Sequence, residues 1–524
     1  MKTLKLKQVI IAGVVGSQFG LPVFAADNAA TGTNGAASVD IPAFAADGGS
    51  PAQEAEIKAL KQQVEALVEK VDALEQHTPT AQAATISDLD QQVRILQRQR
   101  EIDQETATAK AATAPKISLG ANGFSFSSAD TNFVLQLHAV LQFDSRTFFH
   151  DDNAKGVDGF LLRRARPILS GTVARDFEYN FTPDFGGSQV QIFDAYTIYH
   201  GAPYFQIEAG KFKPPVGLEA LQADVNTSFN ERSLATDLVP NRDLGLAFKG
   251  DVSGGVASYV VGLFNGASDY NSTVTNSYAQ NNKSVDARLF FQPWKNSDVN
   301  GLRGFGFGVG GSYENDNPAT NVTTSLTPGY TTDGQQKFFT YNKNVYADGV
   351  HWRLSPQSYY YYGPFGLLGE YAISDQRVSN DNIGGKKNVD VHNTAWDIAG
   401  SWLLTGEDAS YNNGVTPRQN FDPRLNHWGA WQVVARYAEL NVDNDVFSGY
   451  SINHNYSLAN PTTSADGAQA WALGLNWYLN KNVRANLSFA HTTFSEAYGG
   501  NKYASGSVPA QSENVLFTRI QLAF

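Results

Sequence analysis

Arginine recurs at alternate positions in several segments of the chain that read as β-strands. Arg164 and Arg166 share one face of residues 159–173. In five further segments an arginine lies among polar residues, opposite Val, Leu, Phe or Trp: Arg288, Arg353, Arg436, Arg484 and Arg519. A guanidinium stays charged, and its planar fork matches the oxygens of phosphate or carboxylate. Arginines gathered on one polar surface are therefore expected to bind or guide anions. For any single arginine, the alternative is a structural pair with a carboxylate such as Asp194, Asp286 or Glu231.

The segments that carry these arginines alternate apolar and polar residues from about residue 131 to the C-terminus. In the last segment, Ile520 and Leu522 face one way, and Arg519 and Gln521 face the other. An apolar face opposite a polar one is what a wall between lipid and water requires. After the signal region, no run approaches the ~20 apolar residues of a transmembrane helix. We therefore expect an outer-membrane β-barrel, with a soluble all-β protein as the alternative.

Sixteen strands can be placed, and the predicted fold class is all-β: a 16-stranded antiparallel transmembrane β-barrel with an N-terminal α-helical coiled-coil segment. Most long connections follow odd-numbered strands and most short turns follow even-numbered ones, as in barrels with external loops and periplasmic turns. Residues 406–425 are an unexplained exception on the short-turn side. The strands are expected at 131–145, 159–173, 177–186, 189–200, 204–212, 243–251, 256–264, 284–294, 302–313, 349–362, 365–377, 391–405, 426–440, 467–479, 482–495 and 511–524.

Arg163 breaks the alternation, because it faces away from Arg164 and Arg166. An arginine on the lipid side costs ~2–4 kcal/mol at the membrane midplane and much less near the rim. We therefore expect that Arg163 lies at the rim or that a β-bulge turns it inward.

The third external loop, about residues 213–242, is the candidate constriction of a water-filled lumen. Its apolar residues need a surface to pack on, and the inside of the barrel wall is one option. The alternative is an external loop folded on itself or on a neighbour. Lys211, Lys213 and Arg242 lie at its base. Lys337 and Lys343 would add charge if the loop at 314–348 also enters the lumen.

The N-terminal part divides by composition. Residues 1–25 have the basic start, apolar centre and small-residue cleavage site of a signal peptide. Residues 26–50 are expected to form a flexible linker, and residues 106–130 a second one. Between them, residues 51–105 are expected to form a periplasmic coiled coil, whose heptads are typical of a pair of helices.

Composition excludes several classes of function. The chain has 524 residues, no cysteine and a formal charge of −12. The charge argues against a nucleic-acid partner, and the absence of cysteine excludes disulfides and Cys-ligated zinc. No hydrolase or metalloprotease motif is present. We expect no catalytic residues, no metal and no cofactor.

Several short motifs follow one another in a characteristic order along residues 131–524. They are Phe160 to Arg166, Phe193 to Tyr196, Gly210 to Glu219, Glu231 to Ser233, Leu354 to Gln357, Gly363 to Gly366, Leu404 to Glu407, Ala435 to Tyr437 and Asn476 to Asn480. Together they resemble the phosphate-selective porin family, porins O and P. The resemblance implies a trimeric sixteen-stranded outer-membrane barrel with an inward third loop and an arginine-rich lumen. It also implies that Arg232 and Asp194 lie at or near a central anion site, and that Arg163 and Arg164 belong to an arginine ladder.

One departure from the family pattern concerns phosphate. Phosphate-binding members carry a lysine shortly before the Glu-Arg-Ser motif, whereas residues 218–229 here contain no Lys or Arg and hold Glu219 and Asp224. The expected function is passive diffusion of anions, with phosphate or polyphosphate as candidate solutes. The expected partners are outer-membrane lipid, two further copies in a homotrimer, small anions, and the cell wall through the coiled coil. A general porin and a barrel-anchored tether or adhesin are the alternatives.

Overall fold

The structure is a computed structural model that describes residues 59, 62–67, 69–70, 79–121, 123–149, 156–187, 190–272, 282–316, 327–380, 387–449, 457–495 and 512–524. The predicted signal peptide, the first linker and much of the first run of heptads lie outside these residues. The chain forms two compact units, residues 1–103 and 104–524. Within the described residues, no helix has both the length and the apolar character needed to cross a membrane.

One long helix, α3 (Pro79–Thr113), covers the end of the predicted coiled coil and continues beyond it. Residues 106–130 are not the linker that the sequence suggests, because α3 runs to Thr113 and is followed by β1 (Lys116–Gly120) and β2 (Gly123–Ser127). The continuation has a local cause: residues 106–113 contain four alanines, and alanine is the best helix former. Ile95, Leu96 and Ile102 of α3 are exposed in the single chain. Pairing of this helix with another helix remains a prediction.

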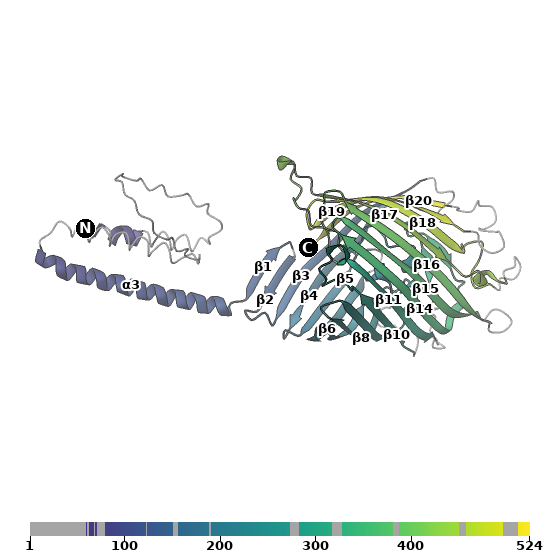
Figure 1. Ribbon diagram of the computed structural model, residues 1–524, viewed down its shortest axis with the longest axis horizontal. Helices are drawn as coiled ribbons and strands as arrows, with labels where there is room; N and C mark the ends of the chain where they lie inside the picture. Colours follow the sequence, from purple (N-terminus) through teal and green to yellow (C-terminus); the bar gives the residue numbers. More distant parts are fainter. Residues whose placement is uncertain are drawn as a thin grey trace. The chain divides into compact units, whose positions relative to one another are not determined.

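The barrel is one closed antiparallel sheet of sixteen strands, in which each strand pairs with its neighbours along the chain (Figure 1). β20 pairs with β3 and closes the wall, with Phe517 opposite Arg146. The predicted fold is confirmed, and the strand ends differ from the expected ones by at most four residues. The strands are β3 (Val134–Phe148), β4 (Gly159–Val173), β5 (Phe177–Asp184), β6 (Gln191–Ala202), β7 (Phe205–Phe212), β8 (Asp243–Val252), β9 (Ala257–Phe264), β10 (Ser284–Phe291), β11 (Phe305–Asp316), β14 (Val345–Tyr362), β15 (Phe365–Asn380), β16 (Lys387–Leu403), β17 (Ala430–Asn441), β18 (Gly467–Tyr478), β19 (Val483–Phe494) and β20 (Ser512–Ala523).

Side-chain alternation determines which face of each strand points outward. In β20, Ile520 is 61% exposed whereas the adjacent Arg519 is 1% exposed. Successive residues of a strand point to opposite faces, so the apolar positions form the outer surface and the polar positions face the interior. Aromatic pairs lie near the short turns, such as Trp431 with Trp477, whose ring centroids are 5.1 Å apart. Such pairs are typical of the girdle at a membrane interface.

Candidate functional site

The connection between β7 and β8, residues 213–242, is the third loop of the barrel. It contains the short helix α4 (Leu218–Leu221) and the 3-10 helix η1 (Leu234–Leu238). Val216 and Leu238 are fully buried, and they belong to one apolar cluster with Ala372 of β15 and Ala395 of β16. Burying these side chains removes apolar area from water and favours the folded position of the loop.

Polar side chains of the wall also bind the backbone of the third loop. The amides of Leu218 and Glu219 donate hydrogen bonds to the carboxylate of Glu370 on β15, at 2.7 and 2.9 Å. Arg484 on β19 donates to the carbonyl of Thr227 at 2.8 Å. Glu370 and Arg484 alternate along their strands with apolar neighbours that face outward, so both side chains point into the barrel. The third loop, which they bind, therefore lies against the inner face of the wall.

The fifth loop, between β11 and β14, also reaches inward-facing residues of the wall. Its strands β12 (Gly329–Thr331) and β13 (Lys337–Thr340) form a separate hairpin. Asp333 in this hairpin accepts two hydrogen bonds from Arg436 of β17, both at 2.9 Å. The amide of Thr331 donates to Asp237 of the third loop at 2.8 Å. The two loops therefore pack on each other.

Lys337 and Lys343 of the fifth loop are exposed. The loop therefore contributes an acidic side chain, Asp333, to the interior rather than the lysines considered from the sequence.

The long connection between β16 and β17, which the sequence leaves unexplained, packs on the third loop through Tyr411. Its hydroxyl donates to the carbonyl of Leu218 at 2.6 Å, and its ring stacks on Tyr359 with centroids 4.9 Å apart. Its carbonyl accepts from the Gln222 amide at 3.0 Å. The length of this connection follows from its path: it leaves the short-turn side of the barrel and reaches the third loop.

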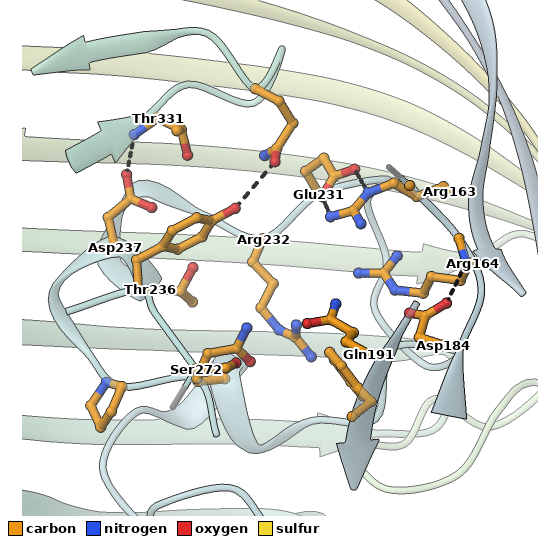
Figure 2. Close-up of a pocket in the computed structure, with 18 of the residues that line it drawn as sticks. Arg163, Arg164, Asp184, Gln191, Glu231, Arg232, Thr236, Asp237, Ser272 and Thr331 are labelled. Atoms are coloured by element: carbon orange, nitrogen blue, oxygen red, sulfur yellow. Dashed lines mark hydrogen bonds and ion pairs between the residues drawn. The ribbon is translucent and has the colours of Figure 1, made fainter. Parts of the chain in front are cut away.

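A cavity of about 780 Å³ lies beside the third loop (Figure 2). Figure 2 shows Arg163 and Arg164 entering it from β4 and Arg232 entering it from the third loop. Arg166 and Lys211 are also among its lining residues. The structure thus brings together these five predicted cations around one space.

Arg163 faces the cavity because β4 contains a bulge. The register between β3 and β4 passes from Gln142 opposite Arg164 to Phe143 opposite Leu162, which leaves Arg163 as the extra residue. A bulge of this kind reverses the direction of the side chain. Of the two explanations considered from the sequence, the bulge is confirmed.

Glu231 of the third loop is the partner of Arg163. The two side chains make a bidentate pair at 2.6 and 2.8 Å, and Arg146 adds a third hydrogen bond at 3.0 Å. Burial alone would raise the pKa of Glu231, but the guanidinium of Arg163 outweighs burial and holds this pKa well below its usual range. The Glu231 carboxylate is therefore charged and fixes the loop to the wall.

Asp224, also in the third loop, is shared by three arginines. It forms ion pairs with Arg164 at 3.3 Å, with Arg232 at 2.5 Å and with Arg166. Burial would raise its pKa, but the surrounding guanidiniums, first that of Arg164, hold the pKa well below the usual value. One negative charge here balances only part of the positive charge around it.

Two networks of ion pairs beside the third loop, one centred on Glu231 and one on Asp224, each carry a net positive charge. The network of Glu231 contains three guanidiniums and one further carboxylate: Arg146, Arg163, Arg519 and Asp144. The network of Asp224 also contains three guanidiniums and one further carboxylate: Arg164, Arg166, Arg232 and Asp184. Lys211 adds a further cation that lines the cavity, and it makes no hydrogen bond or ion pair with any residue that the structure describes. Charge around the cavity therefore favours an anion there.

The other residues predicted at the base of the loop point elsewhere. Lys213 donates to the carbonyls of Leu221 and Gln222 at 3.2 and 2.7 Å. Burial, reinforced by neighbouring guanidiniums, holds the pKa of Lys213 well below its usual value.

Arg242 pairs with Asp194 at 3.2 Å. Neither Asp194 nor Arg242 is among the residues that line the cavity. Arg232 and Asp194, expected together at a central site, thus have different ion-pair partners.

The remaining predicted arginines lie inside the barrel but do not line this cavity. Arg519 pairs with Asp144 at 2.6 Å, and Arg353 pairs with Asp269 at 2.5 Å. Arg288 donates to a side-chain amide instead, that of Gln357, at 2.8 Å. Arg436 pairs with Glu219 of the third loop at 3.2 Å as well as with Asp333 of the fifth loop. Arg484 donates to the third loop, as described above. For these residues the contacts match the structural alternative more closely than a solute-binding role.

Four residues that the sequence analysis does not single out contribute to this region. Arg146 follows the same alternation as Asp144 on β3, so that pattern would have found it. Asp184, the partner of Arg166 at 2.6 Å, ends β5 on the same polar face as Asn180 and Thr182, so alternation would have found it as well. Asp333 and Tyr411 come from loops, whose inward position no local pattern indicates.

Glu314, Asp316 and His351 have the spacing of metal ligands among the described residues. However, Arg353 donates to Glu314 at 3.2 Å and lies 3.3 Å from Nδ1 of His351. A guanidinium at that place satisfies the carboxylate and repels a metal cation. The group is therefore a buried ion-pair network, which also includes Asp269 of the loop after β9.

The sequence model of the family described as "Phosphate-selective porin O and P" matches residues 135–524. The chain belongs to this family. It is thus an outer-membrane porin, as the motifs and the barrel indicate. Porin O of Pseudomonas aeruginosa is 24% identical over 398 residues, which are 70% of this chain and 84% of the relative.

Two solved porin structures are similar to this porin over most of their length. The outer-membrane channel DcaP of Acinetobacter baumannii gives a TM-score of 0.47 at 11% identity, covering 76% of this chain and 99% of that one. The anion-selective porin from Comamonas acidovorans gives a TM-score of 0.43 at 11% identity, covering 74% of this chain and 99% of that one.

Proposed function

We propose that this porin conducts small anions by passive diffusion, and that the third loop forms the constriction at which they are selected. The observation that carries the proposal is the excess of cationic groups beside the third loop, together with Lys211, which has no ionic partner among the described residues. An anion entering the cavity would meet guanidiniums held in place by Asp224 and Glu231. Fixed donors bind an anion without further reorganisation of the protein.

Phosphate is one candidate solute and polyphosphate is another, but the loop argues for a broader anion preference. The lysine that phosphate-binding relatives carry before the Glu-Arg-Ser motif is missing here, and Asp224 occupies this stretch. A carboxylate beside the arginines weakens the attraction for a doubly charged anion more than for a singly charged one, because the repulsion grows with the charge of the solute.

The test is a reversal-potential measurement in a planar bilayer under a chloride gradient, followed by addition of phosphate. Anion selectivity is expected, with weak block of the chloride current by phosphate. Lys211→Gln is expected to reduce anion selectivity, because it removes a cation that lines the cavity. The matched control is Arg424→Gln, whose side chain is 86% exposed in a turn and should leave selectivity unchanged. Cation selectivity of the native porin would overturn the proposal.

A homotrimer is the proposed assembly, by resemblance to the family, and the exposed apolar residues of α3 support a role for the helix in association. We further propose that the N-terminal helices contact the cell wall. The porin would then tether the outer membrane to the cell wall in addition to its role in transport. Chemical crosslinking of the purified chain should give trimers. Removal of residues 26–105 should leave conductance unchanged but reduce recovery of the porin with isolated peptidoglycan.

A further inference from the structure

The hairpin of β1 and β2, residues 116–127, lies outside the sixteen-stranded wall but is hydrogen-bonded to it. β2 pairs with the first residues of β3, with Phe124 opposite Leu137. β20 pairs with β3 from Val140 onward, and β4 occupies the opposite edge of β3 along both stretches. β2 therefore takes the same edge as β20 and continues the wall beyond the end of β20, as the position of β1 and β2 beside β3 in Figure 1 illustrates.

One face of the hairpin is apolar and exposed. Ile117 lies opposite Phe126, and Leu119 lies opposite Phe124. Residues directly opposite each other in an antiparallel pair point to the same side of the sheet. Ile117 and Leu119 are each 70% exposed, and both phenylalanines are 40% exposed. The other face carries short polar side chains such as Ser118, which lies opposite Ser125.

The apolar face continues the outer surface of the barrel. Phe124 shares its side of the sheet with Leu137 through their pairing, and Leu141 lies on the same side, four residues further along β3. Leu141 is 44% exposed and lies opposite Leu522 of β20, which belongs to the outer apolar surface. The exposed residues of the hairpin therefore extend the surface that meets lipid in an outer-membrane barrel.

The hairpin is also fixed at its tip. The side-chain amide of Asn482, in the turn between β18 and β19, donates to the carbonyl of Ala121 at 2.6 Å and to that of Ala523 at 2.7 Å. This contact holds the tip beside the end of β20. It lies at the short-turn end of the barrel, which faces the periplasm in proteins of this architecture.

We propose that the β1–β2 hairpin is a lipid-binding extension of the barrel, whose apolar face contacts phospholipid of the periplasmic leaflet. The hairpin presents four large apolar side chains on one face, and contact with lipid removes their exposed area from water, which is favourable. Only Ala114 and Pro115 separate α3 from β1. The lipid contact therefore also holds the C-terminal end of α3 at the membrane surface.

Site-directed spin labelling tests this surface, because the chain has no native cysteine. Leu119→Cys and Ser118→Cys place a nitroxide on opposite faces at adjacent positions of β1. The full chain is reconstituted in vesicles of phosphatidylethanolamine and phosphatidylglycerol, and the accessibility of each label to oxygen and to a water-soluble nickel complex is measured. The label at 119 should be accessible to oxygen and protected from nickel, like a label at Ile520→Cys on the barrel wall. The label at 118 should be more accessible to nickel.

Two outcomes would overturn the proposal. Equal access of nickel to both labels would place the hairpin in water. An immobile label at 119, protected from both reagents, would place its apolar face against protein, such as a second copy of the chain. If Leu119→Cys does not fold, Phe126→Cys carries the same expectation on β2, with Ser125→Cys as its control.

Discussion

Arg163 and Glu231 connect the barrel wall to the third loop through two hydrogen bonds of 2.6 and 2.8 Å. The contact depends on the bulge in β4, since regular alternation would point Arg163 outward. Arg146 approaches the same carboxylate from β3. The bulge, two strands and one loop carboxylate together form a single structural unit.

Replacing Glu231 by Gln should destabilise the barrel, because Arg163 and Arg146 lose their carboxylate. Removing one partner of a buried ion pair costs about 3–5 kcal/mol, and the partial exposure of Arg163 places this pair at or below the lower end of that range. Thermal unfolding in detergent, followed by circular dichroism, measures the loss. Asp390→Asn breaks the exposed pair with Arg377 and should cost less than about 1 kcal/mol. Equal shifts for the two variants would contradict the structural role of Glu231.

The wall of the barrel is predictable from the sequence because its signal is local. Ile520 and Arg519 alternate in exposure as their types require. The same rule places every predicted lumen arginine of the strands except Arg163. For Arg163 the sequence leaves two explanations open. A bulge depends on the register with the neighbouring strand, and a single strand does not reveal that register.

The ion pairs are not predictable in the same way. Arg163 and Glu231 are 68 residues apart, and Arg436 and Asp333 are 103 residues apart. Alternation indicates that an arginine faces inward, but the position of a loop carboxylate depends on how the loop folds inside the barrel. For this reason a charge count along the strands overestimates the positive charge available to a solute.

Asp237 should make the folded barrel less stable as the pH rises. Burial raises the pKa of Asp237 well above its usual value, even though the amide of Thr331 partly stabilises the charged form. A carboxyl whose folded pKa is raised contributes stability below its unfolded pKa of about 3.9, and that stability is lost as pH rises through the folded pKa. Asp237→Asn keeps an acceptor for Thr331 and has no charge. The variant should unfold at a higher temperature than the native porin near about pH 8, and at a similar temperature near about pH 4. A constant difference between these two pH values would count against this explanation.

Tyr411 should limit the conductance from the short-turn side. Its hydroxyl binds the carbonyl of Leu218, and its ring stacks on Tyr359. Tyr411→Phe removes one hydrogen bond, at a cost of about 1 kcal/mol, and keeps the stacked ring. Tyr411→Ala removes both side-chain contacts and leaves the connection held to the third loop only through backbone carbonyls, such as that of residue 411, which accepts from Gln222. Single-channel recordings should show a larger conductance for the alanine variant and nearly native conductance for the phenylalanine variant. Native conductance in both would show that this connection does not obstruct the passage.

Asp224 should set how strongly the passage prefers anions, because its carboxylate is shared by Arg164, Arg166 and Arg232. Asp224→Asn leaves these three guanidiniums with one more uncompensated positive charge beside the cavity. The reversal potential under a chloride gradient should move toward the chloride equilibrium potential, whereas Lys211→Gln should move it in the opposite direction. Recordings at low and high salt separate a charge effect from a change in pore width, because only the charge effect is screened by salt. If both variants shift the potential in the same direction, selectivity arises outside this cavity.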